Sequence, residues 1–390
     1  MAEKKASDIF LSVGAPINIK INGNAVPVNQ TVMTGDAVKT LLYEVLNEKQ
    51  IKEYEDELEL NTAYALEGVG AFRISAFRQK GTPAVVVRYI PGSIPPLDSL
   101  GVPEVLKEVI MAKRGLILMV GATGSGKSTS LSAMIDYRNE RKAGHILTLE
   151  DPVEFIFQNK KSIVNQREVG TDTKNFSIAL KNALRQAPDI ILIGEIRDKD
   201  TMGMALAYAQ SGHLALATLH ANNSYHAMNR IINFYPLENR PSLLLDLSAA
   251  LQSIISQRLI RTKTGGRMAA VEVLLNTRHV AELIEKGEIN EIKDALEKSM
   301  SPGSQTFEQA LFKLFMDGKI TQEEAMANAD SATNMLWLIN QATAGDITGQ
   351  DAPAPPAATE SKQEEKKESI LAPVGAANAS FSSFKIDMPG

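Results

Sequence analysis

The chain has 390 residues, of which 44% are hydrophobic, enough for two globular domains with apolar cores. Its formal net charge is −5 and its basic residues are spread along the chain, unlike the basic stripe of a dedicated nucleic-acid-binding protein. The absence of cysteine excludes disulfides and cysteine-based zinc sites. Because no apolar run has the length of a signal peptide or a membrane span, we expect a cytoplasmic protein without direct membrane insertion.

Residues 1–97 are expected to form a small α/β domain. The strand-like runs are Ile17–Ile21, Gly70–Phe77 and Ala84–Ile90. In Gly70–Phe77, β-forming residues alternate with polar ones, which predicts a half-buried strand, and Thr40–Leu46 has a helical pattern. Segment Pro91–Pro96 contains three prolines and a glycine, so it is expected to be an interdomain linker.

Strands and helices are predicted to alternate across residues 98–345. Leu116–Val120 and Ile190–Ile193 are continuously apolar, which is typical of strands buried on both faces of a parallel sheet. Each run leads through a glycine-containing turn into a helical pattern, the rhythm of an α/β domain, and residues 279–340 are mostly helical. Residues 346–390 are rich in proline and charge and are predicted to be a disordered tail.

The segment Gly121–Ser128 reads GATGSGKS and fits the phosphate-binding pattern G-x-x-x-x-G-K-S/T. A predicted strand precedes it and a predicted helix, about residues 128–137, follows it. Glycines let backbone N–H groups surround phosphates, the lysine is expected to reach the β and γ phosphates, and the serine to supply a hydroxyl to Mg²⁺. The predicted ATP-binding residues are Gly121, Ala122, Thr123, Gly124, Ser125, Gly126, Lys127, Ser128 and Thr129.

Two further predicted strands end in carboxylates. The run Ile190–Ile193 leads to Glu195. In P-loop enzymes the strand beside the P-loop strand ends in an acid that holds Mg²⁺ directly or through water. A second strand, Ile146–Leu149, is followed by three acids, Glu150, Asp151 and Glu154. One of these carboxylates is expected to orient the attacking water, but the residues alone do not rank them, and a solvated acidic turn is the alternative.

Two of the five histidines, His213 and His220, bracket the apolar strand Leu214–Leu219. Seven residues apart, they do not form a simple metal pair. His220 lies at the C-terminal end of that strand, where a sensor of the γ-phosphate would be placed. The alternative is that both are hydrogen-bonded structural histidines.

These segments together resemble the secretion ATPase superfamily, which drives type II secretion and type IV pili. Leu184–Asp198 resembles the signature of that family, Glu150–Glu154 its aspartate box, and Gly212–Asn222 its histidine box. The similarity covers residues 7–340. Within the superfamily the chain is similar to the short retraction branch, PilT and PilU, because it lacks both the cysteines and the length for the additional N-terminal domain of extension ATPases.

Three stretches resemble PilU more than PilT, namely Gln166–Gly170, Leu184–Asp189 and Ala217–Asn223. The PilT branch carries a C-terminal motif close to A-I-R-N-L-I-R-E, whereas this chain has HVAELIEK at His279–Lys286. This departure favours a PilU-type accessory retraction ATPase over a PilT-type principal one. A RecA-like or helicase-like nucleic-acid motor is the alternative from another class, which the acidic balance of the chain disfavours.

The resemblance implies a homo-hexameric ring with an N-terminal PAS-like and a C-terminal RecA-like domain. It implies a PilT-type paralogue and an inner-membrane pilus platform protein as partners, with the ring at the cytoplasmic face of that membrane. It also implies three roles: Glu150 polarises the attacking water, Glu195 lies near Mg²⁺, and His220 lies near the γ-phosphate.

The same resemblance implies that Arg73 and Arg88 close on the nucleotide phosphates from the N-terminal domain and that Arg230 lies near the site. A dissociative phosphoryl transition state spreads charge over oxygens that need planar cationic donors. Arg73 and Arg88 lie on two candidate strands, so a hairpin would bring them together. Their alternative is a surface charge on an exposed sheet face.

Overall fold

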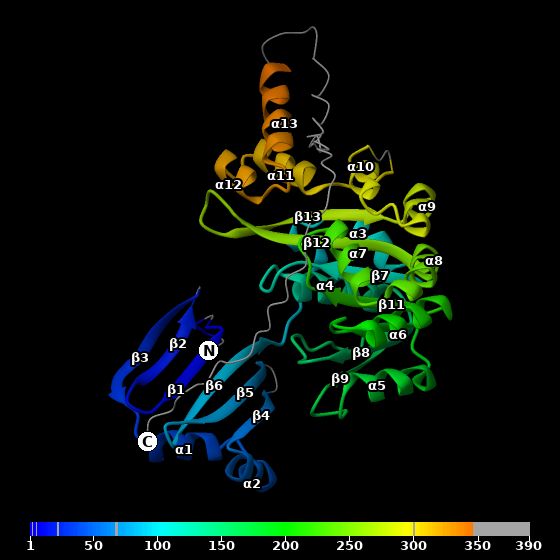
Figure 1. Ribbon diagram of the computed structural model, residues 1–390. Coiled ribbons are helices and arrows are strands. Elements are labelled where there is room, and N and C mark those ends of the chain that lie inside the picture. Colours follow the sequence, from blue (N-terminus) through cyan, green and yellow to red (C-terminus); the bar gives the residue numbers. More distant parts are fainter. Residues whose placement is uncertain (2, 5, 22, 67–68, 299–300, 346–390) are drawn as a thin grey trace, which may run out of the picture. The chain divides into compact units, whose positions relative to one another are not determined.

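The computed structural model describes residues 1, 3–4, 6–21, 23–66, 69–298 and 301–345. It contains a six-stranded sheet within residues 8–91 and a seven-stranded sheet within residues 115–275 (Figure 1). The predicted mixed α/β class is therefore confirmed. The predicted tail, residues 346–390, lies outside the described residues, and the predicted domain boundaries stay predictions.

The first sheet is antiparallel, in the order β3-β2-β1-β6-β5-β4. Its strands are β1 Asp8–Ser12, β2 Pro16–Ile21, β3 Asn24–Val32, β4 Glu59–Leu66, β5 Gly70–Gln79 and β6 Thr82–Pro91, and its helices are α1 Gly35–Tyr43 and α2 Glu48–Glu57. The helix expected at Thr40–Leu46 both begins and ends earlier. Thr34 caps α1, its hydroxyl accepting from the Ala37 N–H, and Asn47 already caps α2 in a capping box with Gln50.

Only one face of this sheet belongs to its apolar core. Ile74, Ala76 and Val85 are buried on that face with Val38 of α1 and Tyr54 of α2. Because side chains alternate along a strand, the intervening residues of β5 and β6 lie on the opposite face. This sheet thus offers a second face for polar groups.

The second sheet has the order β13-β12-β7-β11-β10-β8-β9, parallel except for β13. Its strands are β7 Gly115–Val120, β8 Gly144–Glu150, β9 Ser162–Glu168, β10 Ile190–Ile193, β11 Leu214–Leu219, β12 Leu251–Arg261 and β13 Arg267–Leu275. The sequence pattern implied that β10 lies beside the P-loop strand β7, and this is wrong because β11 lies between them. The apolar run LALATL of β11 is almost wholly buried, so it takes an interior place in the sheet.

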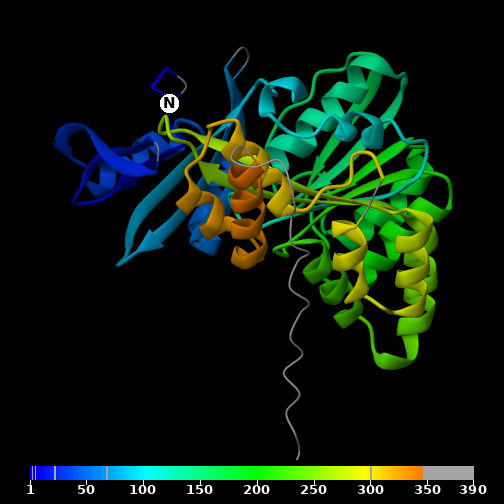
Figure 2. The ribbon, with the colours of Figure 1, turned by 90° about the horizontal axis from the view of Figure 1, so that it is seen from above.

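Helices cover both faces of this sheet (Figure 2). They are α3 Val105–Ile110, α4 Lys127–Arg141, α5 Phe176–Ala183, α6 Lys199–Gln210, α7 Ser224–Asn233 and α8 Arg240–Ala250, with short 3-10 turns η1 Leu97–Leu100, η2 Leu184–Gln186 and η3 Leu237–Asn239. Ile117 and Met119 of β7 pack with α3 and α4, whereas Leu116 and Leu118 pack with α5 to α8. The predicted strands buried on both faces are confirmed for β7 and β10.

The chain beyond β13 is mostly helical, as predicted. Its helices are α9 Arg278–Lys286, α10 Glu291–Glu297, α11 Phe307–Met316, α12 Gln322–Asn328 and α13 Ala332–Gly345. Phe307, Leu311 and Met335 pack on Ile260 of β12 and Ala270 of β13. In the part of the chain that the structure describes, no helix has the length and apolar character needed to cross a membrane.

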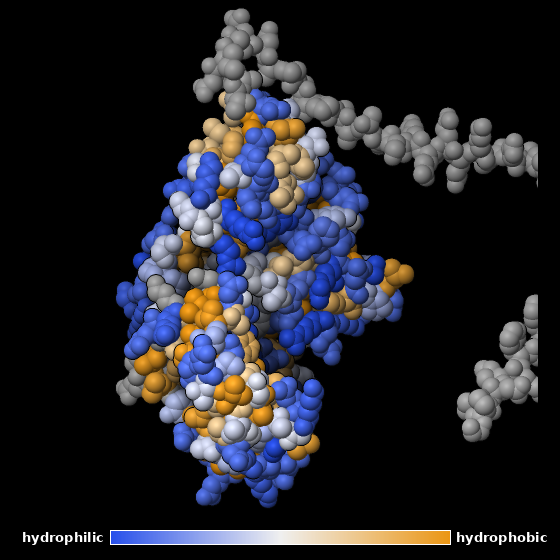
Figure 3. All heavy atoms as spheres, turned by 90° about the vertical axis from the view of Figure 1, so that its left-hand side faces the viewer, coloured by the Kyte–Doolittle hydropathy of each residue, from blue (hydrophilic) through white to orange (hydrophobic). Residues whose placement is uncertain are grey.

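The surface mixes hydrophilic areas with smaller hydrophobic ones (Figure 3). The edge strand β3 is exposed along its whole length, including Val28 and Val32. Single exposed apolar residues are normal on soluble proteins, so they carry no functional conclusion by themselves.

Candidate nucleotide site

The P-loop joins the end of β7 to the start of α4 and requires glycine at two close approaches. At Gly126, φ is +85° and a Cβ would lie 2.7 Å from the Gln257 side-chain nitrogen. At Gly121 a Cβ would lie 2.5 Å from the Ser125 hydroxyl. Any side chain at these two positions would therefore displace part of the loop or of β12.

Lys127 opens α4 and is held against the loop. Its ammonium donates to the carbonyl oxygens of Gly121, at 2.7 Å, and Ala122, at 2.8 Å. Burial lowers the pKa of this ammonium, since Lys127 is only 8% exposed. A cation so placed at a helix N-terminus is positioned for an anionic ligand.

A cavity of about 530 Å³ joins the P-loop to the carboxyl ends of the neighbouring strands. From the P-loop and α4 it is lined by Thr123, Gly124, Gly126, Lys127, Ser128 and Thr129. Acids and a histidine predicted from the sequence line the same space, namely Glu150, Asp151, Glu154, Glu195 and His220. The structure thus brings together residues from four parallel strands and the loops that follow them, as expected at the carboxyl edge of such a sheet.

Glu150 ends β8 and is the most enclosed of these acids. It is 9% exposed, and its carboxylate accepts from the Thr148 hydroxyl at 2.7 Å and the Gln166 amide at 3.2 Å. Burial raises the pKa of Glu150, and these two hydrogen bonds oppose the shift. A buried carboxylate with a raised pKa is a suitable proton acceptor, and this environment separates Glu150 from Asp151 and Glu154.

Arg197 connects the two acidic segments, a role that the sequence analysis did not assign. Its Nε donates to the Glu195 carboxylate at 2.6 Å, and its guanidinium lies 3.6 Å from the Asp151 carboxylate. The Nε2 of His220 lies 3.4 Å from the other Glu195 oxygen. The sequence shows this arginine directly after the acidic strand, but it does not show the pairing, because Asp151 lies far away in the chain.

Ser128 and Glu195 line one cavity and offer a hydroxyl and a carboxylate oxygen, the ligand type that Mg²⁺ prefers. Within the described residues, no cluster of three or more histidine, aspartate or glutamate side chains could hold a metal ion alone. A hydroxyl and a carboxylate would leave the other coordination positions of such an ion to phosphate oxygens and water.

Arg73 and Arg88 are direct partners in the β5–β6 hairpin, as the sequence analysis expected, and therefore share one face of the sheet. The Nε of Arg88 donates to the Asp8 carboxylate at 2.9 Å. Although burial raises it, the hydrogen bonds from Arg88 and Ser7 hold the pKa of Asp8 below its usual value. Neither arginine lines the cavity, nor does Arg230, which lies in the last turn of α7.

Strands β12 and β13 contribute cavity residues that sequence reasoning missed. Leu259 and Arg267 line the cavity, and Gln257 donates to the Ser125 carbonyl at 2.9 Å while accepting from the Ser130 hydroxyl at 2.7 Å. These residues lie more than a hundred positions after the P-loop and carry no motif. The only signal was the polar run SQR inside the apolar strand β12.

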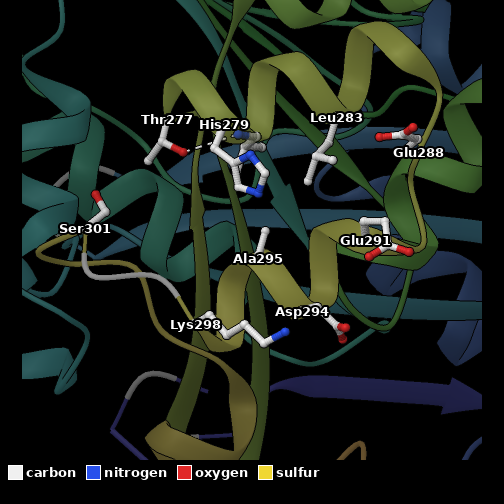
Figure 4. Close-up of a pocket in the computed structure, with 10 residues that line it drawn as sticks. Thr277, His279, Leu283, Glu288, Glu291, Asp294, Ala295, Lys298 and Ser301 are labelled. Atoms are coloured by element: carbon white, nitrogen blue, oxygen red, sulfur yellow. Dashed lines mark hydrogen bonds between the residues drawn. The ribbon is translucent and has the colours of Figure 1, made fainter.

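A second cavity, of about 710 Å³, lies between α9 and α10 (Figure 4). His279, at the start of the stretch compared above with the PilT motif, lies on one side of it, and Glu291, Asp294 and Lys298 lie on the other. Several carboxylates and the lack of a glycine-rich loop make this cavity unsuited to phosphate. The smaller cavity at the P-loop is therefore the candidate site.

Comparison with known proteins decides the family. The family described as "Type II/IV secretion system protein" matches residues 2–327. The chain belongs to this family. Among relatives of this secretion ATPase, the type IV pilus ATPase PilU of Pseudomonas aeruginosa is 47% identical over 89% of this chain and 91% of its own. PilT of the same organism, a type IV pilus retraction ATPase, is 41% identical over 85% and 97%.

A crystal structure of the pilus retraction motor PilT with bound ADP superposes on this secretion ATPase with a TM-score of 0.80. It is 40% identical and covers 86% of this chain and 96% of its own. The chain is thus a nucleotide-binding ATPase of the PilT/PilU type, with a higher identity to PilU than to PilT from one organism. The resemblance drawn from the sequence motifs is confirmed.

Proposed function

We propose that this protein is a Mg²⁺-dependent, hexameric ATPase that powers type IV pilus retraction and twitching motility, as a PilU-type accessory motor at the cytoplasmic face of the inner membrane. The observation that carries the proposal is the single cavity that unites the P-loop with Glu150, Glu195 and His220. The pilus assignment rests on the names of its relatives, PilU and PilT. Its proposed partners are other copies of the chain, a PilT-type paralogue and the pilus platform protein.

In this proposal the P-loop backbone and Lys127 bind the β and γ phosphates. Lys127 exchanges the carbonyls of Gly121 and Ala122, which it now contacts, for anionic oxygens. Ser128 and Glu195 hold Mg²⁺, which when bound neutralises charge on the phosphate oxygens.

Glu150 accepts the proton of the attacking water. Thr148 and Gln166 fix the carboxylate, so that one of its oxygens stays aimed at the nucleophile. His220 lies against Glu195 and responds to the γ-phosphate. Arg197 pairs with both Glu195 and Asp151, so its positive charge offsets the repulsion between these two carboxylates.

Arg73 and Arg88 supply cationic donors from the first sheet. The Asp8 carboxylate contacts Arg88 through its Nε at 2.9 Å, and in this proposal the terminal nitrogens of the guanidinium bind phosphate oxygens. Arg230 is proposed to lie near the site of the assembled ring.

A retraction assay tests this function. In cells lacking every other retraction ATPase, this protein is expected to give little retraction, and adding a PilT-type partner should restore it. Vigorous retraction by this protein alone would instead identify a PilT-type principal motor. Phosphate release by the purified chain, lost on removal of Mg²⁺ with a chelator, tests the hydrolysis itself.

A further inference from the structure

Neighbouring residues of β12 contact opposite sides of the second sheet. Side chains alternate along a strand, so Gln257 faces α4 and the P-loop, whereas Ser256 and Arg258 face α7 and the C-terminal helices. Gln257 is 2% exposed and bonded to Ser125 and Ser130 as described above. One rigid strand thus connects the phosphate-binding loop with helices that follow β13.

Arg258 contacts several segments on the side of the sheet that faces α7 and the C-terminal helices. Its guanidinium donates to the carbonyl oxygen of Asn222 at 3.2 Å and to that of Asn328, and it forms an ion pair with Asp330. It also stacks on Phe307 of α11, with 3.8 Å between the guanidinium carbon and the ring centroid. Asn328 is the last residue of α12, and Asp330 lies in the link between α12 and α13.

Hydrogen bonds hold the turn that directly follows His220, and one of them comes from Asp330, the ion-pair partner of Arg258. Asp330 accepts from the Asn223 amide at 2.7 Å, and Asn223 caps α7 by accepting from the His226 N–H at 2.9 Å. The Ser224 N–H donates to the buried Glu272 carboxylate at 2.7 Å. Consecutive residues after His220 are therefore fixed from β12, from β13 and from the link between α12 and α13.

We propose that Arg258 and Asp330 are positioning residues for ATP hydrolysis. By fixing Asn222 and Asn223 they hold His220 beside Glu195, so that turnover depends on where α12 and α13 lie. The planar guanidinium donates to two carbonyls and a carboxylate while it stacks on the Phe307 ring, an arrangement that the point charge of a lysine ammonium does not reproduce. The inference rests on the proposed hydrolysis at the P-loop cavity and adds residues outside it to the reaction.

Steady-state kinetics of the full chain test the inference. Arg258→Lys and Asp330→Asn are each expected to lower kcat about tenfold, as loss of a charge-assisted hydrogen bond allows, with KM for ATP unchanged within about twofold. Matched controls are Arg261→Lys, exposed on the same strand, and Asp317→Asn, exposed after α11, which should keep the wild-type kcat. If Arg258→Lys fails to fold, Asp330→Asn still tests the inference, because asparagine keeps the shape of the aspartate side chain.

A double-mutant cycle separates positioning from a merely structural role. In a His220→Ala background, Arg258→Lys is expected to have no further effect on kcat, because the group it positions is gone. The same fold decrease in both backgrounds, or a raised KM with unchanged kcat, would overturn the inference. Full turnover by His220→Ala alone would contradict the proposed role of His220, and no phosphate release by wild type would contradict the proposed function.

Discussion

The β5–β6 hairpin and the central strands β7, β10 and β11 carry their polar side chains at different places along the strand. The hairpin is covered by helices on one face only, and its other face carries Arg73 and Arg88 in the middle of the strands. The central strands are buried on both faces and apolar apart from Thr218 near the end of β11, so their functional groups lie at or just beyond the strand ends. A half-buried sheet can carry charge along its strands, whereas a fully buried one can carry it only at the edge.

The largest effect is expected at the cavity that joins the P-loop to the ends of the central strands. Lys127→Ala removes the buried cation at the phosphates and should reduce kcat about 1000-fold. Phosphate release by the purified protein measures it, and Lys113→Ala, exposed before β7, is the matched control. Activity within tenfold of wild type in a folded variant would remove Lys127 from the catalytic role.

Glu150→Gln should lower kcat about 100-fold while leaving nucleotide affinity unchanged, because the amide keeps the shape but cannot accept the proton. Single-turnover hydrolysis and binding of a fluorescent ATP analogue measure the two effects separately. Glu154→Gln is the control, since that acid lines the same cavity. If both variants hydrolyse ATP at the wild-type rate, Asp151 becomes the next candidate for the base.

Arg73→Ala and Arg88→Ala should each lower kcat about tenfold, which corresponds to about 1.4 kcal/mol. The hairpin adds a distinction between them. Arg88→Ala also leaves the buried Asp8 without this ion-pair partner and should lower the free energy of unfolding by about 1 kcal/mol, whereas Arg73→Ala should not. Urea unfolding and kinetics together check this, with Arg261→Ala as control. An arginine whose removal leaves kcat unchanged is a surface charge.

The pH dependence tests the burial of Glu150. Its pKa is raised, so kcat should fall as pH drops through a value above the ordinary glutamate pKa of about 4.3. Thr148→Val removes a hydrogen bond that favours the charged form, which should move this acid limb to higher pH. An acid limb that stays in place would show that another group controls the rate.

The smallest effect is expected for deletion of residues 346–390, which lie outside the described residues. Their composition predicts a disordered tail outside the catalytic core, so kcat and the number of subunits in the ring should both stay unchanged. Phosphate release and light scattering of the truncated chain measure these quantities. Loss of assembly on truncation would place the tail within the folded motor.

The sequence alone predicted much of the difference between the hairpin and the central strands. Apolar runs identified the strands buried on both faces, and the GATGSGKS pattern identified the loop that shapes the cavity. Alternation predicted that β5 is half-buried, and the placement of Arg73 and Arg88 on two neighbouring candidate strands predicted that a hairpin would bring them together. These features depend on local periodicity or on contiguous residues, which a sequence displays directly.

The rest depends on contacts between distant segments. The place of β11 between β7 and β10 follows from packing, and no local pattern specifies it. Arg267 and Gln257 reach the P-loop only because β12 pairs with β7. Likewise, Arg258 finds Asp330 across more than seventy positions, and neither residue belongs to a motif. Long-range pairing of this kind is visible only once the chain is folded.

The contact between Gly126 and Gln257 has a consequence for how this protein can vary. The last glycine of the P-loop lines the cavity on one side and meets an amide of β12 on the other, so two requirements converge on one position. A side chain at 126 would also be strained at φ +85°, so a smaller residue at 257 alone would not accommodate it. Position 126 is therefore expected to stay glycine, and the amide at 257, which lies 131 positions further along the chain, to keep its hold on Ser125 and Ser130.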